Sequence, residues 1–226
     1  MSGFDLNDVA YIKAVDESAI VTNGMVMFLD AGNKNSYVGY GTNVKDLSGK
    51  GNSGIFTTPI WSNSNGGIFQ FNTTNYIRVN TLILTSGTST IMGAARYNSG
   101  SSRARIISAI TNNWLLGHWN GNTENFYSTG WVTAVGVGIG DTVWRIYAGT
   151  MNTAGASYAL YVNGILTAGP NNAGTQGPNG LCIGTSIGFP EPSNGELGFV
   201  MAYNRVLSPA EIIQNYRAMK GRYGLN

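Results

Sequence analysis

The sequence predicts an all-β domain, an antiparallel β-sandwich with a short C-terminal helix. Three observations lead to this prediction: β-favouring runs recur along the chain, Asn-Gly pairs separate many of them, and one capped helical pattern stands near the end. Asn-Gly between β-rich runs is the strongest short-range hairpin signal, because both central residues of a type I′ turn need positive φ. The pairs begin at Asn23, Asn65, Asn120, Asn163, Asn179 and Asn194.

Composition suits one globular domain. The chain has 226 residues, of which 42% are hydrophobic and only 11% charged, well under the quarter that is usual for soluble domains. A net charge of +2 from 13 basic and 11 acidic residues gives no concentrated field, so no nucleic-acid partner is expected. The single cysteine, Cys182, excludes an internal disulfide and a Cys-rich zinc site.

The N-terminal segment lacks the basic and apolar regions of a signal peptide. No run approaches the roughly 18 apolar residues of a membrane span, so no membrane association is expected. Residues 1–22 hold four acids and no strand alternation, and we interpret them as an N-terminal arm before a sandwich domain at 23–226. The arm is either a loosely ordered terminus or a tether that docks on a partner.

The first expected strand lies within 24–33 (GMVMFLDAGN) and is followed by VKDLSGKGNSG. Asp46 and Ser48 are expected to cap turn amides in that loop. This interpretation is preferred to a metal site, because a hard cation needs several oxygen ligands that no regular acidic loop provides here.

Further strands are expected at 68–71, 75–79, 88–97 and 103–110. Arg96, Arg103 and Arg105 indicate either a small basic patch or a solvated sheet face. The glycine-rich run at 134–141 lacks the third glycine and the helix of a dinucleotide loop, so we interpret it as a bend.

The segment 112–132 (NNWLLGHWNGNTENFYSTGWV) concentrates aromatic, amide and hydroxyl groups, a combination that sugar-binding surfaces use. The alternative is that Trp114 and Trp131 are core residues of adjacent strands. The only histidine is more often a satisfied interior or loop residue than a ligand or base. The candidate carbohydrate-contacting residues are Trp114, His118, Trp119, Asn120 and Tyr127.

The longest strand signal, 143–168, has Asn163-Gly164 as its turn and is expected at the centre of a sheet. Two last strands follow at 181–184 and 196–203.

Ser208-Pro209-Ala210-Glu211 is a capping box with proline at the first helical position. Ile212, Tyr216 and Met219 then share one helical face, and Gly221 is expected to end the helix.

Several motifs resemble the laminin-G-like, concanavalin A-like lectin-glucanase family, namely LYVNG at 160–164, LDAGN at 29–33, DLSG at 46–49 and YNRVLSPAEI at 203–212. The resemblance covers about residues 24–224 and implies a concanavalin A-like jelly roll. The family's usual acids near Asn72, Asn75 and Gly198 are replaced here. The resemblance allows calcium, but no ligand motif supports it, so no cofactor or metal site is expected.

Some enzymes with this fold are retaining glycosidases, which use two carboxylates about 5 Å apart. Their usual E-x-D-x-x-E arrangement is missing, and one histidine without a nucleophile motif predicts no triad. The chain is therefore expected to be non-catalytic.

The spelling LLGHWNG…FYSTGWV is similar to virion-associated members of the family, those of tailed phages. This resemblance implies a capsid decoration protein on the head surface, assembled in the host cytoplasm and located in the virion, with weak glycan binding as an added activity. Its expected partners are the major capsid protein or other virion proteins, a polysaccharide, and further copies of itself in a homo-oligomer. The alternative is a carbohydrate-binding adhesin or the receptor-binding module of a tail fibre.

Overall fold

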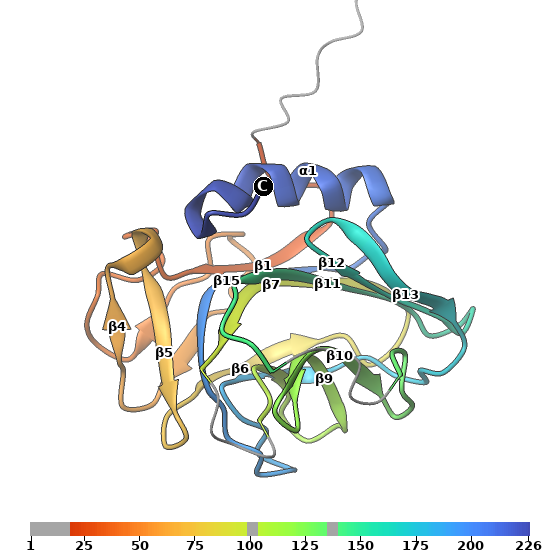
Figure 1. Cartoon of the computed structure of the whole chain (residues 1–226), viewed down its shortest axis with the longest axis horizontal. Helices are drawn as coiled ribbons and strands as arrows, with labels where there is room; N and C mark the ends of the chain where they lie inside the picture. The colour runs from red at the N-terminus through yellow and green to blue at the C-terminus, as the bar shows by residue number, and fades with distance from the viewer. Residues whose placement is uncertain (1–18, 99–103, 135–139) are drawn as a thin grey trace, which may run out of the picture.

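The computed structural model describes residues 19–98, 104–134 and 140–226. Two antiparallel sheets pack face to face and one helix lies outside them (Figure 1), which confirms the predicted β-sandwich. Sheet A has the order β13-β12-β11-β7-β15-β5-β4, with β1 also paired to β15. Its strands are β1 (Met25–Asp30), β4 (Trp61–Ser62), β5 (Ile68–Asn72), β7 (Thr88–Tyr97), β11 (Arg145–Asn152), β12 (Ser157–Val162), β13 (Ile165–Asn171) and β15 (Asn194–Tyr203).

Sheet B has the order β10-β9-β8-β14-β6-β3-β2. Its strands are β2 (Asn43–Val44), β3 (Gly54–Phe56), β6 (Ile77–Ile83), β8 (Ile107–Ala109), β9 (Trp114–Trp119), β10 (Asn122–Ser128) and β14 (Asn179–Ile183). The helical elements are η1 (Ser64–Gly66), α1 (Pro209–Met219) and η2 (Lys220–Tyr223).

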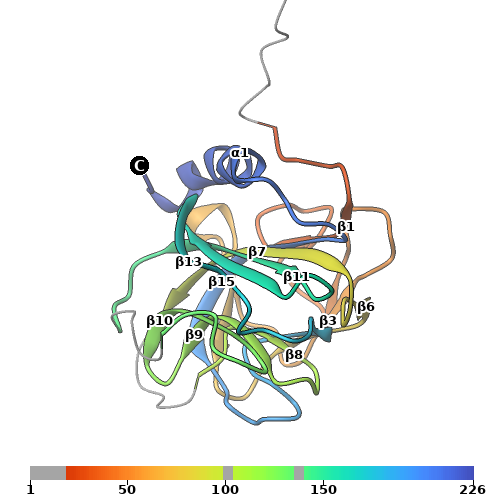
Figure 2. The same ribbon diagram turned by 90° about the vertical axis from the view of Figure 1, so that its right-hand side faces the viewer.

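Two hydrophobic cores hold the layers together. Strand side chains alternate between faces, so Leu29 of β1 enters the core between the sheets while Phe28 enters a second core under α1. The helix lies across the outer face of sheet A (Figure 2) and buries Ile212, Tyr216 and Met219 there. Sheet A is therefore covered on both faces, whereas no helix formed by the described residues lies on the outer face of sheet B.

The start of α1 is as predicted. The Ser208 hydroxyl accepts from the Glu211 amide and the Glu211 carboxylate accepts from the Ser208 amide, which completes the capping box. The end differs, because η2 continues the helical path beyond Gly221. The left-handed residue that stops it is Gly224, at φ 65°.

The expected arm falls into two parts. Residues 1–18 lie outside the described residues. Residues 19–22 lie against α1, where the Val21 amide donates to Asn215 Oδ1 at 2.7 Å. The hydroxyl of Tyr203, on β15, donates to the Val21 carbonyl at 2.9 Å.

The Asn163-Gly164 turn joins β12 to β13 with both residues at positive φ, 52° and 79°, as predicted. Its place in the sheet corrects part of the expectation, because β11 and β12 are interior strands of sheet A whereas β13 forms an edge. Asn194-Gly195 is no turn at all, since both residues belong to β15.

Asp46 builds a turn, as expected. Its carboxylate accepts from the amides of Phe28 and Ser48 at 2.9 Å and of Asn52 at 3.0 Å. Burial favours the neutral carboxyl group, but these hydrogen bonds outweigh it and lower the pKa of Asp46.

In the described ranges, no three His, Cys, Asp or Glu side chains gather as metal ligands. Within the same ranges, no helix is long and apolar enough to cross a membrane.

Candidate functional site

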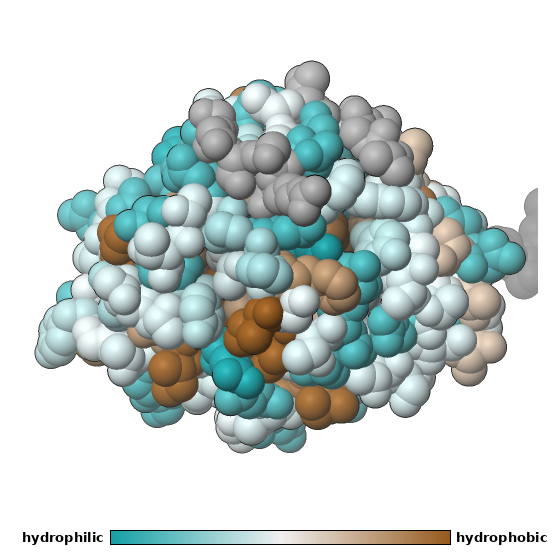
Figure 3. All heavy atoms as spheres, turned by 90° about the horizontal axis from the view of Figure 1, so that it is seen from below, coloured by the Kyte–Doolittle hydropathy of each residue, from teal (hydrophilic) through white to brown (hydrophobic). Residues whose placement is uncertain are grey.

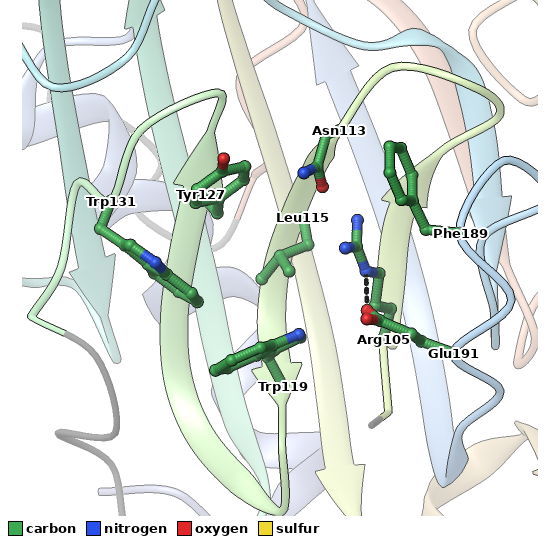
Figure 4. A pocket seen from close by; sticks show the side chains of 8 residues that line it. All are labelled: Arg105, Asn113, Leu115, Trp119, Tyr127, Trp131, Phe189 and Glu191. Carbon is green, nitrogen blue, oxygen red and sulfur yellow. Dashed lines mark hydrogen bonds and ion pairs between the residues drawn. The ribbon is translucent and has the colours of Figure 1, made fainter. Parts of the chain in front are cut away.

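A hollow of about 250 Å³ opens on the outer face of sheet B, between β8, β9, β10 and the loop at 184–193 (Figure 4). We call it the aromatic hollow, and its lining residues are Arg105, Asn113, Leu115, Trp119, Tyr127, Trp131, Phe189 and Glu191. Figure 3 shows this side of the molecule, where hydrophobic residues appear as separate islands in a largely polar surface.

Strand alternation on β9 builds the floor and one wall. Trp114 and Leu116 point into the core between the sheets, so Leu115 faces outward and forms the floor. Trp119 also faces the hollow, and Tyr127 joins it from β10.

A tight turn after β10 brings Trp131 back over the sheet. Thr129 adopts φ 56°, an uncommon conformation for a β-branched residue. Gly130 follows, at a point where an added Cβ would lie 1.8 Å from the Ala173 carbonyl oxygen. Trp131 then pairs with Tyr127 in an isolated bridge, and its ring centroid lies 5.0 Å from that of Tyr127 and 4.9 Å from that of Trp119.

The opposite wall is polar. Arg105 Nε donates to the Glu191 carboxylate in an ion pair, and the guanidinium carbon lies 5.2 Å from the centroid of the Phe189 ring. Two buried polar atoms in this wall have no partner within the described protein, Arg105 Nη1 and Asn113 Oδ1. In Figure 4 the polar ends of these two side chains are turned toward each other. A bound group that both accepts and donates hydrogen bonds satisfies both atoms.

The structure divides the sequence-predicted site residues. Trp119 and Tyr127 come together in the aromatic hollow, whereas Asn120 lies in the exposed β9–β10 turn with φ 51°. Trp114 and His118 are both 0% exposed. This corrects their assignment as ligand contacts, because the alternation of β9 points them into the sandwich.

Of the two interpretations of the arginines, the basic patch does not form from the described ones. Arg96 belongs to β7 of sheet A and pairs with Glu196, whereas Arg105 precedes β8 of sheet B and pairs with Glu191. Arg103 lies outside the described residues.

Sequence reasoning missed most of the polar wall. Asn113, Phe189 and Glu191 carried no motif, and Arg105 was considered only for a basic patch. Trp131 was considered for the core but lies half-buried in the hollow. Counting alternate positions from Leu115 to Trp119 would have separated inward from outward aromatic residues.

The structure also explains two departures from the family's acidic positions. Asn75 is 1% exposed, and its amide nitrogen donates to the carbonyls of Gln70 at 2.8 Å and Thr58 at 3.3 Å, which an ionised aspartate cannot do. At Gly198 an added Cβ would lie 1.9 Å from the Tyr223 hydroxyl, so any side chain there requires the ring to move.

The two sheets and the aromatic hollow define the class of protein, a lectin-like β-sandwich. The family model of the Concanavalin A-like lectin/glucanases superfamily (Laminin_G_3) matches residues 71–213, and the chain belongs to this superfamily. The family resemblance is thereby confirmed over residues 71–213. No curated protein sequence matches the chain significantly.

Solved structures share the fold. Domain 4 of AbnA, a GH43 extracellular arabinanase from Geobacillus stearothermophilus solved with arabinotriose, is 17% identical with a TM-score of 0.62; the match covers 85% of this chain and 98% of that one. The Trypanosoma rangeli sialidase is 16% identical with a TM-score of 0.60, covering 90% of this chain and 34% of the sialidase.

The binding domain of Paraclostridial Mosquitocidal Protein 1 is 14% identical with a TM-score of 0.62, covering 86% of this chain and 52% of that domain. The chain thus spans about a third of the sialidase and about half of the mosquitocidal binding domain. At these identities the likeness establishes the concanavalin A-like fold.

Proposed function

We propose that this chain is a non-catalytic carbohydrate-binding domain and that the aromatic hollow is its sugar site. The observation that supports this most is the pairing of aromatic rings with an unpaired donor and acceptor in one hollow. Sugars have apolar ring faces that stack on aromatic side chains, and hydroxyl groups that need hydrogen-bond partners when buried. The arabinotriose complex of the similar arabinanase domain is consistent with this proposal.

The carboxylates support a binding role rather than hydrolysis. In the described ranges, six acidic side chains form ion pairs with arginines: Asp30, Glu124, Asp141, Glu191, Glu196 and Glu211. Asp46 is held by backbone amides. Glycoside hydrolysis needs two carboxylates facing one bond, and Glu191 is the one carboxylate among the described lining residues of the hollow.

The test is a glycan array followed by calorimetry on the best ligand. Replacing a stacking tryptophan at the centre of a binding site typically lowers affinity by tenfold or more, so Trp119→Ala is expected to reduce binding by about that factor. Tyr40→Ala is the matched control, because Tyr40 is 78% exposed and outside the hollow. A wild-type chain that binds no glycan, or a Trp119→Ala variant that binds equally well, contradicts the proposal.

The biological setting is proposed from the motif spelling alone. It places the domain on a tailed-phage particle as a head decoration protein, with an adhesin or tail-fibre module as the alternative. Antibody labelling of purified particles, imaged by electron microscopy, tests this setting. Label over the heads supports decoration, label at the tail tip supports the alternative, and unlabelled particles remove the virion role.

A further inference from the structure

We propose that the aromatic hollow selects a neutral sugar and discriminates against its acidic counterpart. The inference rests on the proposed function, and it concerns the chemical class of the ligand. It follows from the charge of the hollow and from the type of hydrogen-bonding atoms that it leaves unpaired.

The charge of the hollow is already balanced. Arg105 and Glu191 are the two charged side chains among its described lining residues, and they form an ion pair with each other. The Arg105 side chain is only 4% exposed and that of Glu191 is 16% exposed, so water screens this pair weakly. An incoming carboxylate therefore meets a cation whose charge Glu191 already balances. The Glu191 carboxylate also repels it, because both carry a negative charge.

Part of the Arg105 guanidinium is also already engaged. Arginine binds carboxylates best through two parallel N–H bonds, and Arg105 Nε already donates to Glu191. The Phe189 ring covers one face of the same group. The nitrogen without a partner among the described residues is Nη1, whose N–H groups are left to donate to a ligand.

The unpaired acceptor atom in the same wall as Arg105 distinguishes a neutral sugar from an acidic one. Asn113 lines the same hollow, and its Oδ1 receives no hydrogen bond from any described residue. Sugar hydroxyls accept hydrogen bonds, as Arg105 Nη1 requires, and also donate them, as Asn113 Oδ1 requires, whereas an ionised carboxylate only accepts and leaves the Asn113 oxygen unpaired. The types of the two unpaired atoms therefore match hydroxyl groups.

The size of the hollow indicates how much of a glycan enters it. Its volume of about 250 Å³ is below the roughly 300–1,000 Å³ of sites for drug-sized ligands. Trp119, Tyr127 and Trp131 lie on the side opposite the polar wall (Figure 4). A single ring fits with one face on the aromatic side and one hydroxyl edge toward Arg105 and Asn113.

The test uses matched trisaccharides that differ only in oxidation at C6: glucose, galactose and mannose oligomers, each beside its uronic acid counterpart. Calorimetry at pH 7 in low salt measures each pair, because low salt leaves charge effects unscreened. At least one neutral trisaccharide is expected to bind tenfold or more tightly than its acidic partner. Tyr40→Ala, outside the hollow, is expected to leave that ratio unchanged.

Two variants change the charge in opposite directions. Glu191→Gln removes the negative charge and keeps an acceptor oxygen, so affinity for the acidic trisaccharide is expected to rise at least threefold. Asn113→Asp adds a negative charge and leaves the ion pair intact, so the preference for the neutral sugar is expected to widen at least threefold. Thermal melting checks that both variants fold. If Glu191→Gln unfolds the chain, Asn113→Asp alone tests the preference for a neutral sugar.

The outcomes separate the two proposals. Equal or tighter binding of the acidic trisaccharide overturns the neutral-sugar inference and leaves the carbohydrate-binding function standing. Unchanged preference in Asn113→Asp also overturns the inference. If the wild-type chain binds none of the trisaccharides and nothing on a glycan array, the proposed function fails and the inference fails with it.

Discussion

His118 shows how burial changes the chemistry of one side chain. Its ring lies between Tyr97 and Tyr147, with centroids 5.2 and 6.0 Å away, and neither ring nitrogen has a partner in the part of the chain that the structure describes. Burial, and secondarily the charge of Arg145, lower the pKa of His118 to about 3. The side chain is therefore a neutral core residue at physiological pH.

This residue makes folding stability depend on pH. Between about pH 6.5 and pH 3 the unfolded chain binds a proton at His118 that the folded chain does not, so stability is lost as pH falls through this window. The expected contribution is about 1.4 kcal/mol per pH unit. Denaturant unfolding at pH 4 to 7 measures it, and His118→Phe is expected to show a shallower slope. If the stability of the wild type and of His118→Phe has the same slope against pH, His118 is not the source of the pH dependence.

Asn75 provides a second test at the residue scale. Asn75→Asp replaces a donor to two buried carbonyls by a carboxylate, and an unsatisfied buried group costs about 1–3 kcal/mol, or more when charged. The free energy of unfolding is expected to fall by about 3 kcal/mol at pH 7. Asn72→Asp is the control, since Asn72 is exposed and its Oδ1 accepts hydrogen bonds. Similar losses in both variants would refute the assignment.

At the element scale, the turn after β10 positions the aromatic wall. Thr129 and Gly130 reverse the chain so that Trp131 packs on Tyr127 and Trp119. The three rings come from two strands and one turn, so their arrangement depends on the turn conformation. Strained backbone of this kind often accompanies functional sites.

Gly130→Ala tests the turn. The new Cβ would collide with the Ala173 carbonyl oxygen, so we expect a loss of about 1–3 kcal/mol in stability and weaker binding of any glycan that the wild type recognises. Tryptophan fluorescence should also shift as Trp131 moves. Gly221→Ala is the matched control, because nothing lies within 4 Å of its Cβ position. A Gly130→Ala protein with wild-type stability would contradict this account of the turn.

On the scale of the whole molecule, the position of α1 determines which sheet has an outer face left open to a ligand. α1 and η2 cover the outer face of sheet A and enclose the second core, with Tyr223 packed over Gly198. The outer face of sheet B carries instead the loop at 184–193 and the aromatic hollow. β9 and β10, which carry Leu115, Trp119 and Tyr127 of the hollow, lie on the side of the sandwich opposite α1 (Figure 1).

The second core predicts a contrast between neighbouring residues of α1. Ile212 is 0% exposed against sheet A and Ile213 is 36% exposed. Ile212→Ala is expected to lower the free energy of unfolding by about 2–5 kcal/mol through cavity formation, and Ile213→Ala by about 0.5 kcal/mol or less. Chemical denaturation of both variants measures the difference, and equal effects would mean that α1 does not pack as described.

The sequence by itself determined the features that depend on near neighbours. Asn163-Gly164 required a hairpin turn because both residues tolerate positive φ. Ser208 and Glu211 set the start of α1 because their side chains reach amides three residues away. The apolar face of α1 likewise indicated which of its residues are buried, since side-chain direction follows from local geometry.

Only the tertiary structure decided the features that depend on distant partners. Arg105 and Glu191 are 86 residues apart and meet because loop 184–193 lies beside β8. The assignment of Trp119 to the hollow and of Trp114 to the core depends on which face of β9 meets the other sheet. The edge position of β13 depends on strand pairing. The physical reason is that sheet order and sheet packing arise from contacts between distant segments, which local sequence patterns do not specify.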